Sequence, residues 1–205
     1  MRKSYRRIHS ALAGIVRFLF RIKVVGLQNE PEKTDKGILL CSNHMSLLDP
    51  ISINAVLRRT EPFYMAKKSL FKVPVVKTLL KFFNAYPVNR GAGDLSAIHN
   101  SVNLLKAGNC VGIFAQGTRC RGIKLEDTKF KTGAALVCSR AEAHILPVRV
   151  VMKNDRWIPF RKITVVIGKL VPFESLAYES KKSGELDRIT DIIFKEISAL
   201  GAETE

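Results

Sequence analysis

The sequence predicts a single α/β domain, built on a central, mixed and mostly parallel sheet that is flanked by helices. Short apolar runs alternate with longer segments in which apolar residues recur at helical spacing, an order typical of α/β domains. The 205 residues are enough for one well-buried core, and 46% hydrophobic and 25% charged residues are values near the globular average. No internal repeat, low-complexity tract or long linker indicates a second domain.

Six segments have the length and apolar character of strands. They are residues 22–25, 37–42, 63–66, 110–114, 145–151 and 163–167. Helical spacing appears at residues 51–57, 70–83, 95–105 and 186–197. Asp94 is a candidate N-cap for the third of these helices, and Gly108 is a candidate stop. The loops 89–94 and 116–128 are too polar for simple connectors, so we expect them to carry function.

The chain is strongly basic, and its charge is unevenly distributed. Lys and Arg number 34 against 18 Asp and Glu, which gives a net charge of +16. Residues 1–173 hold 30 basic and 10 acidic side chains, whereas the remaining residues hold 4 and 8. A positive body of this kind favours an anionic partner, which could be a membrane surface, a phosphorylated substrate or a nucleic acid.

The N-terminal segment has the pattern of an amphipathic helix that lies on a membrane surface. Residues 2–23 contain seven basic side chains, and the first acidic residue is Glu30. On a helix, one face would carry Ile8, Leu12, Ile15 and Leu19, and the opposite face Arg6, Ser10, Arg17 and Arg21. We therefore expect residues 1–21 to bind an anionic membrane and residues 22–205 to form the globular domain. The alternative is a helix that packs on the protein's own core.

Charged residues also limit what this segment could be. Arg17 and His9 interrupt its apolar run, which argues against a membrane-spanning helix. A signal peptide is disfavoured for the same reason, and because no small-x-small cleavage site follows.

The cysteine pattern indicates neither disulfides nor a metal site. The four cysteines are Cys41, Cys110, Cys120 and Cys138. Three of them lie in apolar runs, where a reduced thiol packs as a small hydrophobic group, so a protein that faces the cytosol fits best. Cys41 and His44 have half the spacing of a zinc site, but no second pair of ligands completes it. We therefore expect no metal.

A histidine and an aspartate after the second predicted strand could form a catalytic pair. His44 follows the apolar run 37–41, and Asp49 comes five residues later. On a regular helix this spacing would put the side chains about 140° apart. Their pairing therefore requires His44 in the turn and Asp49 in the first helical turn, where Pro50 is tolerated. A carboxylate that holds one imidazole nitrogen leaves the other to take a proton from a hydroxyl. By itself, the pattern also fits a surface histidine beside an N-capping aspartate.

The motifs around this pair favour the catalytic interpretation. The pattern Asn43-His44-x4-Asp49 resembles the first signature block of the acylglycerol-phosphate acyltransferase family. Further segments similar to that family follow in its order, at residues 66–71 with Pro74, 87–90, 114–119, 130–134 and 146–148. The resemblance spans about residues 22–172. In the third block, Ala115 and Gln116 replace the proline and glutamate of the family pattern Phe-Pro-Glu-Gly-Thr-Arg.

This resemblance implies an enzyme of phospholipid biosynthesis. Such an enzyme moves a fatty acyl chain from acyl-CoA or acyl carrier protein to the free hydroxyl of lysophosphatidate, giving phosphatidate. It implies no cofactor besides the acyl donor, and a peripheral or monotopic place on the cytoplasmic face of the cell membrane. His44 would be the general base, and Asp49 would orient it. The residues implied at the substrate site are Asn43, Ser46, Lys68, Arg90, Gln116, Gly117, Thr118 and Arg119.

Two of these residues are candidates for holding the acceptor's phosphate. Arg90 and Arg119 each lie in a loop with glycine, where backbone amides can also approach an anion. Gln116 keeps a hydrogen-bonding carbonyl but removes a negative charge, so we expect it to alter acceptor preference more than reaction type. No covalent intermediate is required. The flanking Arg119 and Arg121 could lower the pKa of the Cys120 thiol, but we expect this cysteine to be a bystander.

Three other functions stay open on the sequence. Gln116 allows a different lysolipid acceptor, and it also allows an impaired member of the family that serves as a membrane scaffold. The net charge would suit a non-catalytic binder of nucleic acid. However, no nucleic-acid motif is present, and the single Trp157 with scattered aromatic residues forms no stacking platform. We therefore expect no nucleic-acid partner.

Overall fold

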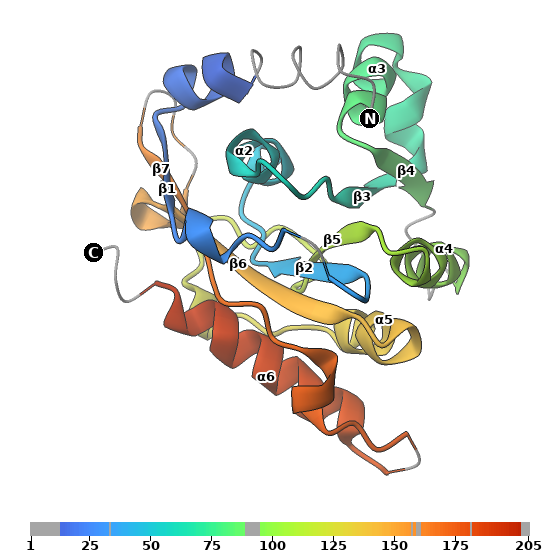
Figure 1. Ribbon diagram of the computed structural model, residues 1–205. Coiled ribbons are helices and arrows are strands. Elements are labelled where there is room, and N and C mark those ends of the chain that lie inside the picture. The colour runs from blue at the N-terminus through green and yellow to red at the C-terminus, as the bar shows by residue number, and fades with distance from the viewer. Residues whose placement is uncertain are drawn as a thin grey trace.

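The computed structural model describes residues 13–32, 34–88, 95–156, 158, 161–180 and 182–201. Within this part of the chain, seven strands form one sheet in the order β1-β7-β6-β2-β5-β3-β4 (Figure 1). They are β1 (Ile22–Val25), β2 (Ile38–Ser42), β3 (Phe63–Lys67), β4 (Ala85–Val88), β5 (Cys110–Phe114), β6 (His144–Met152) and β7 (Ile163–Ile167). In this sheet only the β6–β7 pair is antiparallel. The predicted mixed, mostly parallel sheet is confirmed.

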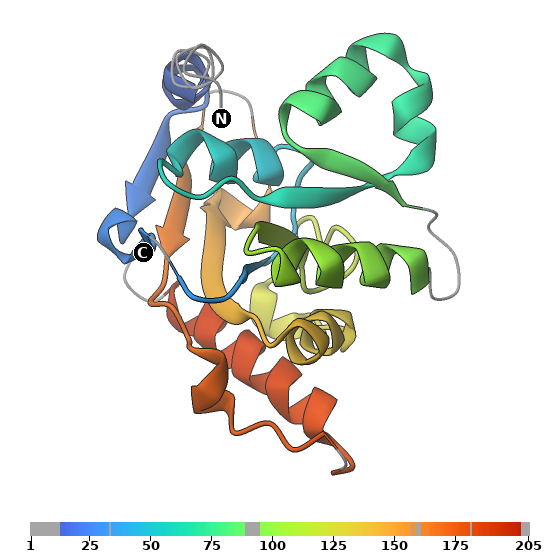
Figure 2. The same cartoon turned by 45° about the vertical axis from the view of Figure 1, so that its right-hand side comes forward.

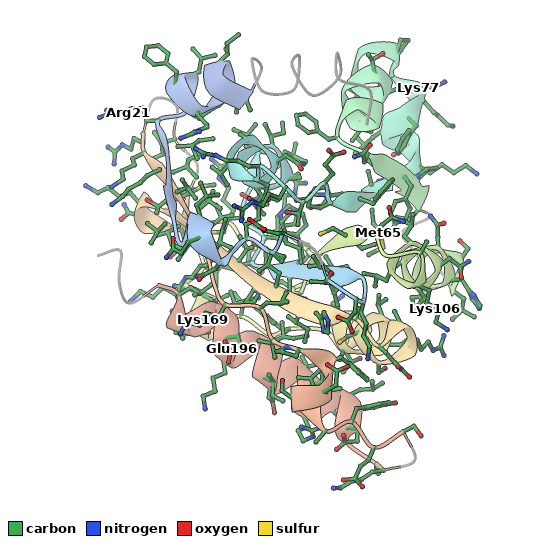
Figure 3. The ribbon with its side chains drawn as sticks, viewed as in Figure 1. Arg21, Met65, Lys77, Lys106, Lys169 and Glu196 are labelled. Carbon is green, nitrogen blue, oxygen red and sulfur yellow. The ribbon has the colours of Figure 1, made fainter. Side chains whose placement is uncertain are left out.

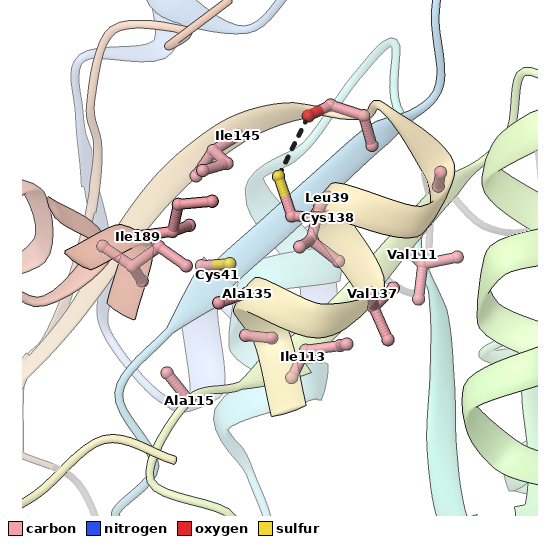
Figure 4. Close-up of a cluster of buried hydrophobic side chains, with 14 of the residues drawn as sticks. Leu39, Cys41, Val111, Ile113, Ala115, Ala135, Val137, Cys138, Ile145 and Ile189 are labelled. Atoms are coloured by element: carbon pink, nitrogen blue, oxygen red, sulfur yellow. Dashed lines mark hydrogen bonds between the residues drawn. The ribbon is translucent and has the colours of Figure 1, made fainter. Parts of the chain in front are cut away.

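Helices cover both faces of the sheet. They are α2 (Asp49–Val56), α3 (Pro74–Phe82), α4 (Leu95–Lys106), α5 (Gly133–Ala141) and α6 (Glu185–Ala199). The helices α5 and α6 lie on one side of the sheet and α2 on the other (Figures 1 and 2). Side chains of β2 alternate between the two resulting cores. Leu39 and Cys41 pack in the cluster with α5 and α6 that Figure 4 shows, whereas Ile38 and Leu40 pack in the cluster with α2.

The described residues include a strand and an α-helix that the sequence patterns did not predict. One is β4, a four-residue edge strand that includes Pro87, a residue that disfavours central strands but is tolerated at an edge. Its Tyr86 Oη lies 2.7 Å from Ser101 Oγ, which joins this edge strand to α4. The other is α5, in which the buried Ala134, Val137 and Ala141 have helical spacing. Small residues made this period hard to recognise.

The predicted helix 70–83 is divided in two. Residues Lys68–Lys72 form the 3-10 helix η2, and α3 begins at Pro74. Proline is well suited to the first position of a helix, and it cannot donate the backbone hydrogen bond that a continuous helix would need. The predicted stop at Gly108 is confirmed, because α4 ends at Lys106 and Gly108 has a φ of 78°.

The N-terminal segment is only partly described. Residues 13–19 are helical, whereas the predicted Ile8, Leu12, Arg6 and Ser10 lie outside the described residues. Val16 and Phe20 pack against the core on the α2 side, but Ile15, Phe18 and Leu19 are 55%, 84% and 50% exposed. This helix therefore contacts the core with one face and leaves apolar side chains on another. Among the described residues, no helix combines the length and apolar character needed to cross a bilayer.

Candidate active site

The candidate active site lies at the carboxyl ends of parallel strands. Strands β2, β5, β3 and β4 are successive parallel neighbours, so the loops that follow them begin at the same edge of the sheet. His44 lies in the loop after β2, Gln116 to Arg119 lie in the loop after β5, and Lys68 follows β3 directly. The sheet thus brings together segments that are far apart in the sequence.

His44 and Asp49 form a buried, hydrogen-bonded pair. His44 Nδ1 lies 2.7 Å from Asp49 Oδ2. Asp49 is the first residue of α2 and has no exposed surface, and His44 is 8% exposed. The predicted geometry, with the histidine in the turn and the aspartate in the first helical turn, is confirmed. The catalytic role of the pair stays a prediction.

Backbone donors also determine the direction of the hydrogen bond between His44 and Asp49. Asp49 Oδ2 accepts the N–H groups of Met45 and Ser46, at 2.7 and 2.8 Å. An oxygen that accepts two such donors is a carboxylate acceptor, so His44 donates to it from Nδ1. The other imidazole nitrogen, Nε2, is then the one able to accept a proton. Among the residues that the structure describes, none forms a hydrogen bond with this nitrogen.

Three residues of β5 and its loop contact His44. The imidazole stacks on the ring of Phe114, with centroids 4.1 Å apart and an angle of 19° between the planes. The backbone N–H of His44 donates to Gln116 Oε1 at 2.6 Å, and the backbone carbonyl of His44 accepts the Cys120 N–H at 2.8 Å. Tyr64 stacks on Phe114 as well, at 5.9 Å. Burial raises the pKa of Tyr64 well above its usual value, so this residue stays neutral.

Gln116 links His44 to the end of the loop 116–128. Its side chain is buried, and its Nε2 donates to Thr128 Oγ1 at 2.9 Å while Oε1 accepts from His44. The Thr128 hydroxyl donates in turn to the Leu125 carbonyl at 2.7 Å. The sequence led us to expect this side chain at the acceptor's headgroup. The structure instead gives both ends of the amide a partner within the protein, so an effect on acceptor preference stays a prediction.

Replacement of Gln116 by leucine should destabilise the fold. It would leave the buried His44 N–H without its acceptor, and an unsatisfied buried group costs about 1–3 kcal/mol. Denaturant unfolding should show this loss. Gln116→Glu, which keeps an oxygen for His44, should lose less. If the leucine variant is as stable as the wild type, the link does not stabilise the turn around His44.

Asn43 and Ser46 shape the turn around His44. Asn43 Nδ2 donates to the Val150 carbonyl at 2.9 Å, and Asn43 Oδ1 accepts the Val150 N–H at 2.8 Å. The buried amide therefore joins the end of β2 to β6. Ser46 Oγ accepts the Leu48 N–H at 3.2 Å. Both residues support the position of His44, and a direct contact of either with substrate stays a prediction.

The loop after β5 carries exposed groups suited to an anion. Gly117, Thr118 and Arg119 are exposed, and Gly117 has a φ of 68°, a conformation that favours glycine. A Cβ atom on Gly117 would lie 2.9 Å from Cδ of Lys131, so the Lys131 side chain lies over this glycine. Sequence reasoning missed Lys131, although it stands in the segment 130–134 that resembles the family. Lys68 is exposed at the start of η2.

Arg90 and the rest of the predicted loop 89–94 lie outside the described residues. The same holds for Asp94, the candidate N-cap of α4.

The expectation that Cys120 is a bystander agrees with the state of its thiol. Burial raises the pKa of Cys120, despite the arginines on either side in the sequence. Burial also raises the pKa of Cys138 to about 12, and it raises the pKa values of Cys41 and Cys110. All four cysteines are free. High thiol pKa values disfavour the thiolate that a cysteine nucleophile needs.

Comparison with known proteins agrees with this geometry. A family model of acyltransferases matches residues 21–151, which include His44, Asp49 and the loop 116–128. The chain therefore belongs to the acyltransferase family.

Curated relatives carry a more particular name. Over 143 residues, the chain is 32% identical to the 1-acyl-sn-glycerol-3-phosphate acyltransferase of Bacillus subtilis (strain 168), and the match covers 70% of this chain and 69% of that protein. It is 30% identical over 162 residues to a protein of the same name from Borreliella burgdorferi, with coverage of 77% and 60%. The matched region is thus less than two thirds of the Borreliella protein.

A solved structure shares the fold. The crystal structure of the 1-acyl-sn-glycerophosphate (LPA) acyltransferase PlsC from Thermotoga maritima matches with a TM-score of 0.72. The match covers 96% of this chain and 80% of that one, at 20% sequence identity. At this identity the likeness shows the fold alone, and it includes nearly the whole chain.

Proposed function

We propose that this enzyme is a 1-acyl-sn-glycerol-3-phosphate acyltransferase, which moves a fatty acyl chain from acyl-CoA or acyl carrier protein to lysophosphatidate and forms phosphatidate. The observation that carries the proposal is the buried His44–Asp49 pair at 2.7 Å, with the backbone donors that fix the direction of its hydrogen bond. The names of the relatives from Bacillus and Borreliella support the acceptor.

In the proposed reaction, His44 Nε2 takes the proton of the acceptor hydroxyl as its oxygen attacks the thioester carbonyl carbon. The positive imidazolium is stabilised by Asp49 through the Nδ1 hydrogen bond. The tetrahedral intermediate then expels the thiolate of the donor, which takes the proton back from Nε2. The new ester bond replaces the thioester bond, and no cofactor or covalent enzyme intermediate takes part.

The acceptor's phosphate would be bound by cations at the same edge of the sheet. Arg119 and Lys131 come from the loop and the segment that follow β5, and Lys68 follows β3. Backbone amides near Gly117 and Thr118 would add donors. Arg90, predicted from the sequence, is proposed as a further contact.

Replacement of Arg119 by alanine should raise the Michaelis constant for lysophosphatidate at least about tenfold, which corresponds to about 1.4 kcal/mol. The Michaelis constant for the donor should hardly change. Arg119→Lys should recover part of the affinity, because it keeps the charge but loses the planar fork. Arg121→Ala, which removes an exposed arginine from the same loop, is the matched control. If Arg119→Ala weakens turnover of a monoacylglycerol as much as that of lysophosphatidate, the arginine does not bind the acceptor's phosphate.

The proposed reaction takes place on the cytoplasmic face of the cell membrane, where the protein would bind peripherally. The exposed Ile15, Phe18 and Leu19 would enter the lipid interface, and basic residues of the segment 2–23 would face anionic headgroups. The protein should therefore float with anionic liposomes, and less so at high ionic strength. Equal flotation with neutral liposomes would contradict an electrostatic contribution.

Mass spectrometry of the products tests the proposed reaction. The protein is mixed with several lysolipids and with either acyl-CoA or acyl carrier protein as donor. Phosphatidate should form from lysophosphatidate with at least one donor. A better yield from another lysolipid would replace the proposed acceptor, which Gln116 allows. If no lysolipid is acylated with either donor, the protein is not an acyltransferase and a scaffold role would take its place.

A further inference from the structure

A second segment, besides the N-terminal helix, has the composition of a membrane contact. Between Glu61 and Asp94, the sequence contains five lysines and one arginine but no acidic residue. Among them, Lys68, Lys72 and Lys77 are exposed on η2 and α3. Positive side chains with no acidic residue among them in the sequence attract an anionic surface.

Apolar side chains are exposed between these lysines. Leu70 is 37% exposed and Val73 is 49% exposed. The Lys77 N–H donates to the Val73 carbonyl at 2.8 Å, so Val73 and Lys77 are one helical turn apart and share a face. Two adjacent apolar side chains flanked by cations suit the interface of an anionic bilayer, whereas an isolated exposed lysine suits water.

The place of this segment in the fold supports the same partner. It projects at the β4 edge of the sheet, where α3 packs mainly on η2 and β4. Figures 1 and 2 show α3 and the N-terminal helix on the same side of the molecule, on either side of α2, with α6 on the far side. Figure 3 shows Lys77 and Arg21 at this side and Glu196 and Lys169 near α6. The exposed Ile15, Phe18 and Leu19 of the N-terminal helix thus belong to the same side.

We propose that η2 and α3 form a second lipid-binding surface, made by Leu70, Lys72, Val73 and Lys77, which docks on an anionic bilayer together with the N-terminal helix. The axis of the N-terminal helix and a second contact away from it together define a plane and so fix the orientation of the enzyme, whereas the helix by itself would allow it to tilt. The turn of His44 leads into α2, which lies between the two contacts (Figures 1 and 2), and Leu47 in this turn is 63% exposed. This arrangement would hold the catalytic turn against the membrane that supplies the acceptor. The proposal concerns membrane binding. It rests on the proposed function only where it states that the membrane supplies the acceptor to His44.

Charge reversal tests the surface in the full-length protein. Lys72→Glu with Lys77→Glu should reduce binding to vesicles of phosphatidylcholine and phosphatidylglycerol at least about 25-fold, since each cation near the surface contributes about fivefold. The difference should shrink at high salt. The matched control is Lys169→Glu with Lys195→Glu, which removes the same charge from exposed positions near and on α6. The proposal is wrong if the first variant binds as the wild type does, or if both variants weaken equally.

A second measurement does not depend on a loss of binding. The Val73→Trp variant should show a blue-shifted emission when the same vesicles are added, and nitroxide-labelled lipids should quench it. The Lys195→Trp variant, changed on α6, should show neither effect, and the wild type corrects for the emission of Trp157. If the emission of the Val73→Trp variant is neither shifted nor quenched, the proposal is wrong. A contact with a bilayer requires the side chain at position 73 to enter the lipid, whereas an acidic protein partner could bind the lysines without this insertion.

Activity on a soluble acceptor separates this proposal from the proposed function. With a short-chain lysophosphatidate and no vesicles, Lys72→Glu with Lys77→Glu should retain the wild-type rate within about twofold, because these residues lie outside the candidate active site. A variant that keeps this activity but leaves the vesicles supports the surface. If the wild type binds vesicles through position 73 but acylates no acceptor, the surface stands and the proposed function fails. If the variant loses both vesicle binding and acylation of the soluble acceptor, the segment is structural and the proposal is overturned.

Discussion

Replacement of His44 by alanine should lower kcat about 10²–10⁴-fold, the range typical of a lost general base. The fold should survive the change. Asp49 Oδ2 would still accept the Met45 and Ser46 N–H groups, and Gln116 would still accept the backbone N–H of residue 44. The stack on Phe114 would be lost, which is worth about 0.5–1.5 kcal/mol. Steady-state kinetics and denaturant unfolding on the same samples measure the two effects.

His99→Ala is a matched control for this variant, because it removes an exposed histidine from α4. Its kcat and stability should be close to those of the wild type. A His44→Ala protein whose kcat is within tenfold of the wild type would exclude His44 as the general base, and the family motif would then need another catalytic group.

Replacement of Asp49 by asparagine should cause the next largest loss of kcat, and the structure indicates how large this loss should be. In a serine protease triad the same change costs about 10⁴ in kcat, because the amide holds the histidine in the wrong tautomer. Here the Met45 and Ser46 N–H groups point at Oδ2, so the oxygen of an asparagine must occupy that position. His44 would then keep its tautomer and lose only the charge that stabilises the imidazolium. We expect kcat to fall about 10²-fold, at the low end for general base catalysis.

The amide nitrogen of this asparagine should also destabilise the protein. It would stand in place of Asp49 Oδ1, a buried atom that has no hydrogen-bond partner among the described residues. The unsatisfied donors should cost about 1–3 kcal/mol, measured by denaturant unfolding. Asp49→Ala should be less active than Asp49→Asn, because it leaves nothing to hold Nδ1. A 10⁴-fold loss of kcat in Asp49→Asn would show that the amide has rotated and placed its nitrogen at the Oδ2 position. The Met45 and Ser46 N–H groups would then not fix its orientation.

Features that depend on neighbours in the sequence could be predicted from the sequence alone. The strands 22–25, 110–114 and 163–167 have the predicted bounds, because each is a short, mainly apolar run rich in Val and Ile, which favour strands. The pairing of His44 with Asp49 was expected from their spacing, from Pro50 at a helix start and from the family-like motifs around them. The edge strand β4 could not be recognised in this way. Pro87 argues against a central strand, and only the position of β4 at the end of the sheet makes it acceptable.

Contacts between distant residues were decided by the tertiary structure. Asn43 is joined to Val150, and Gln116 to His44 and Thr128, so both amides support the turn of His44 from within the protein. In the sequence, each looked like a polar residue of a substrate motif. A hydrogen bond needs a donor and an acceptor within about 3 Å, and for residues 72 or 107 positions apart that distance is set only when the parallel strands pair. The sequence by itself therefore determined which residues could carry the chemistry, and the packed sheet decided which of them hold His44 in place, because strand pairing brings those partners within hydrogen-bonding distance.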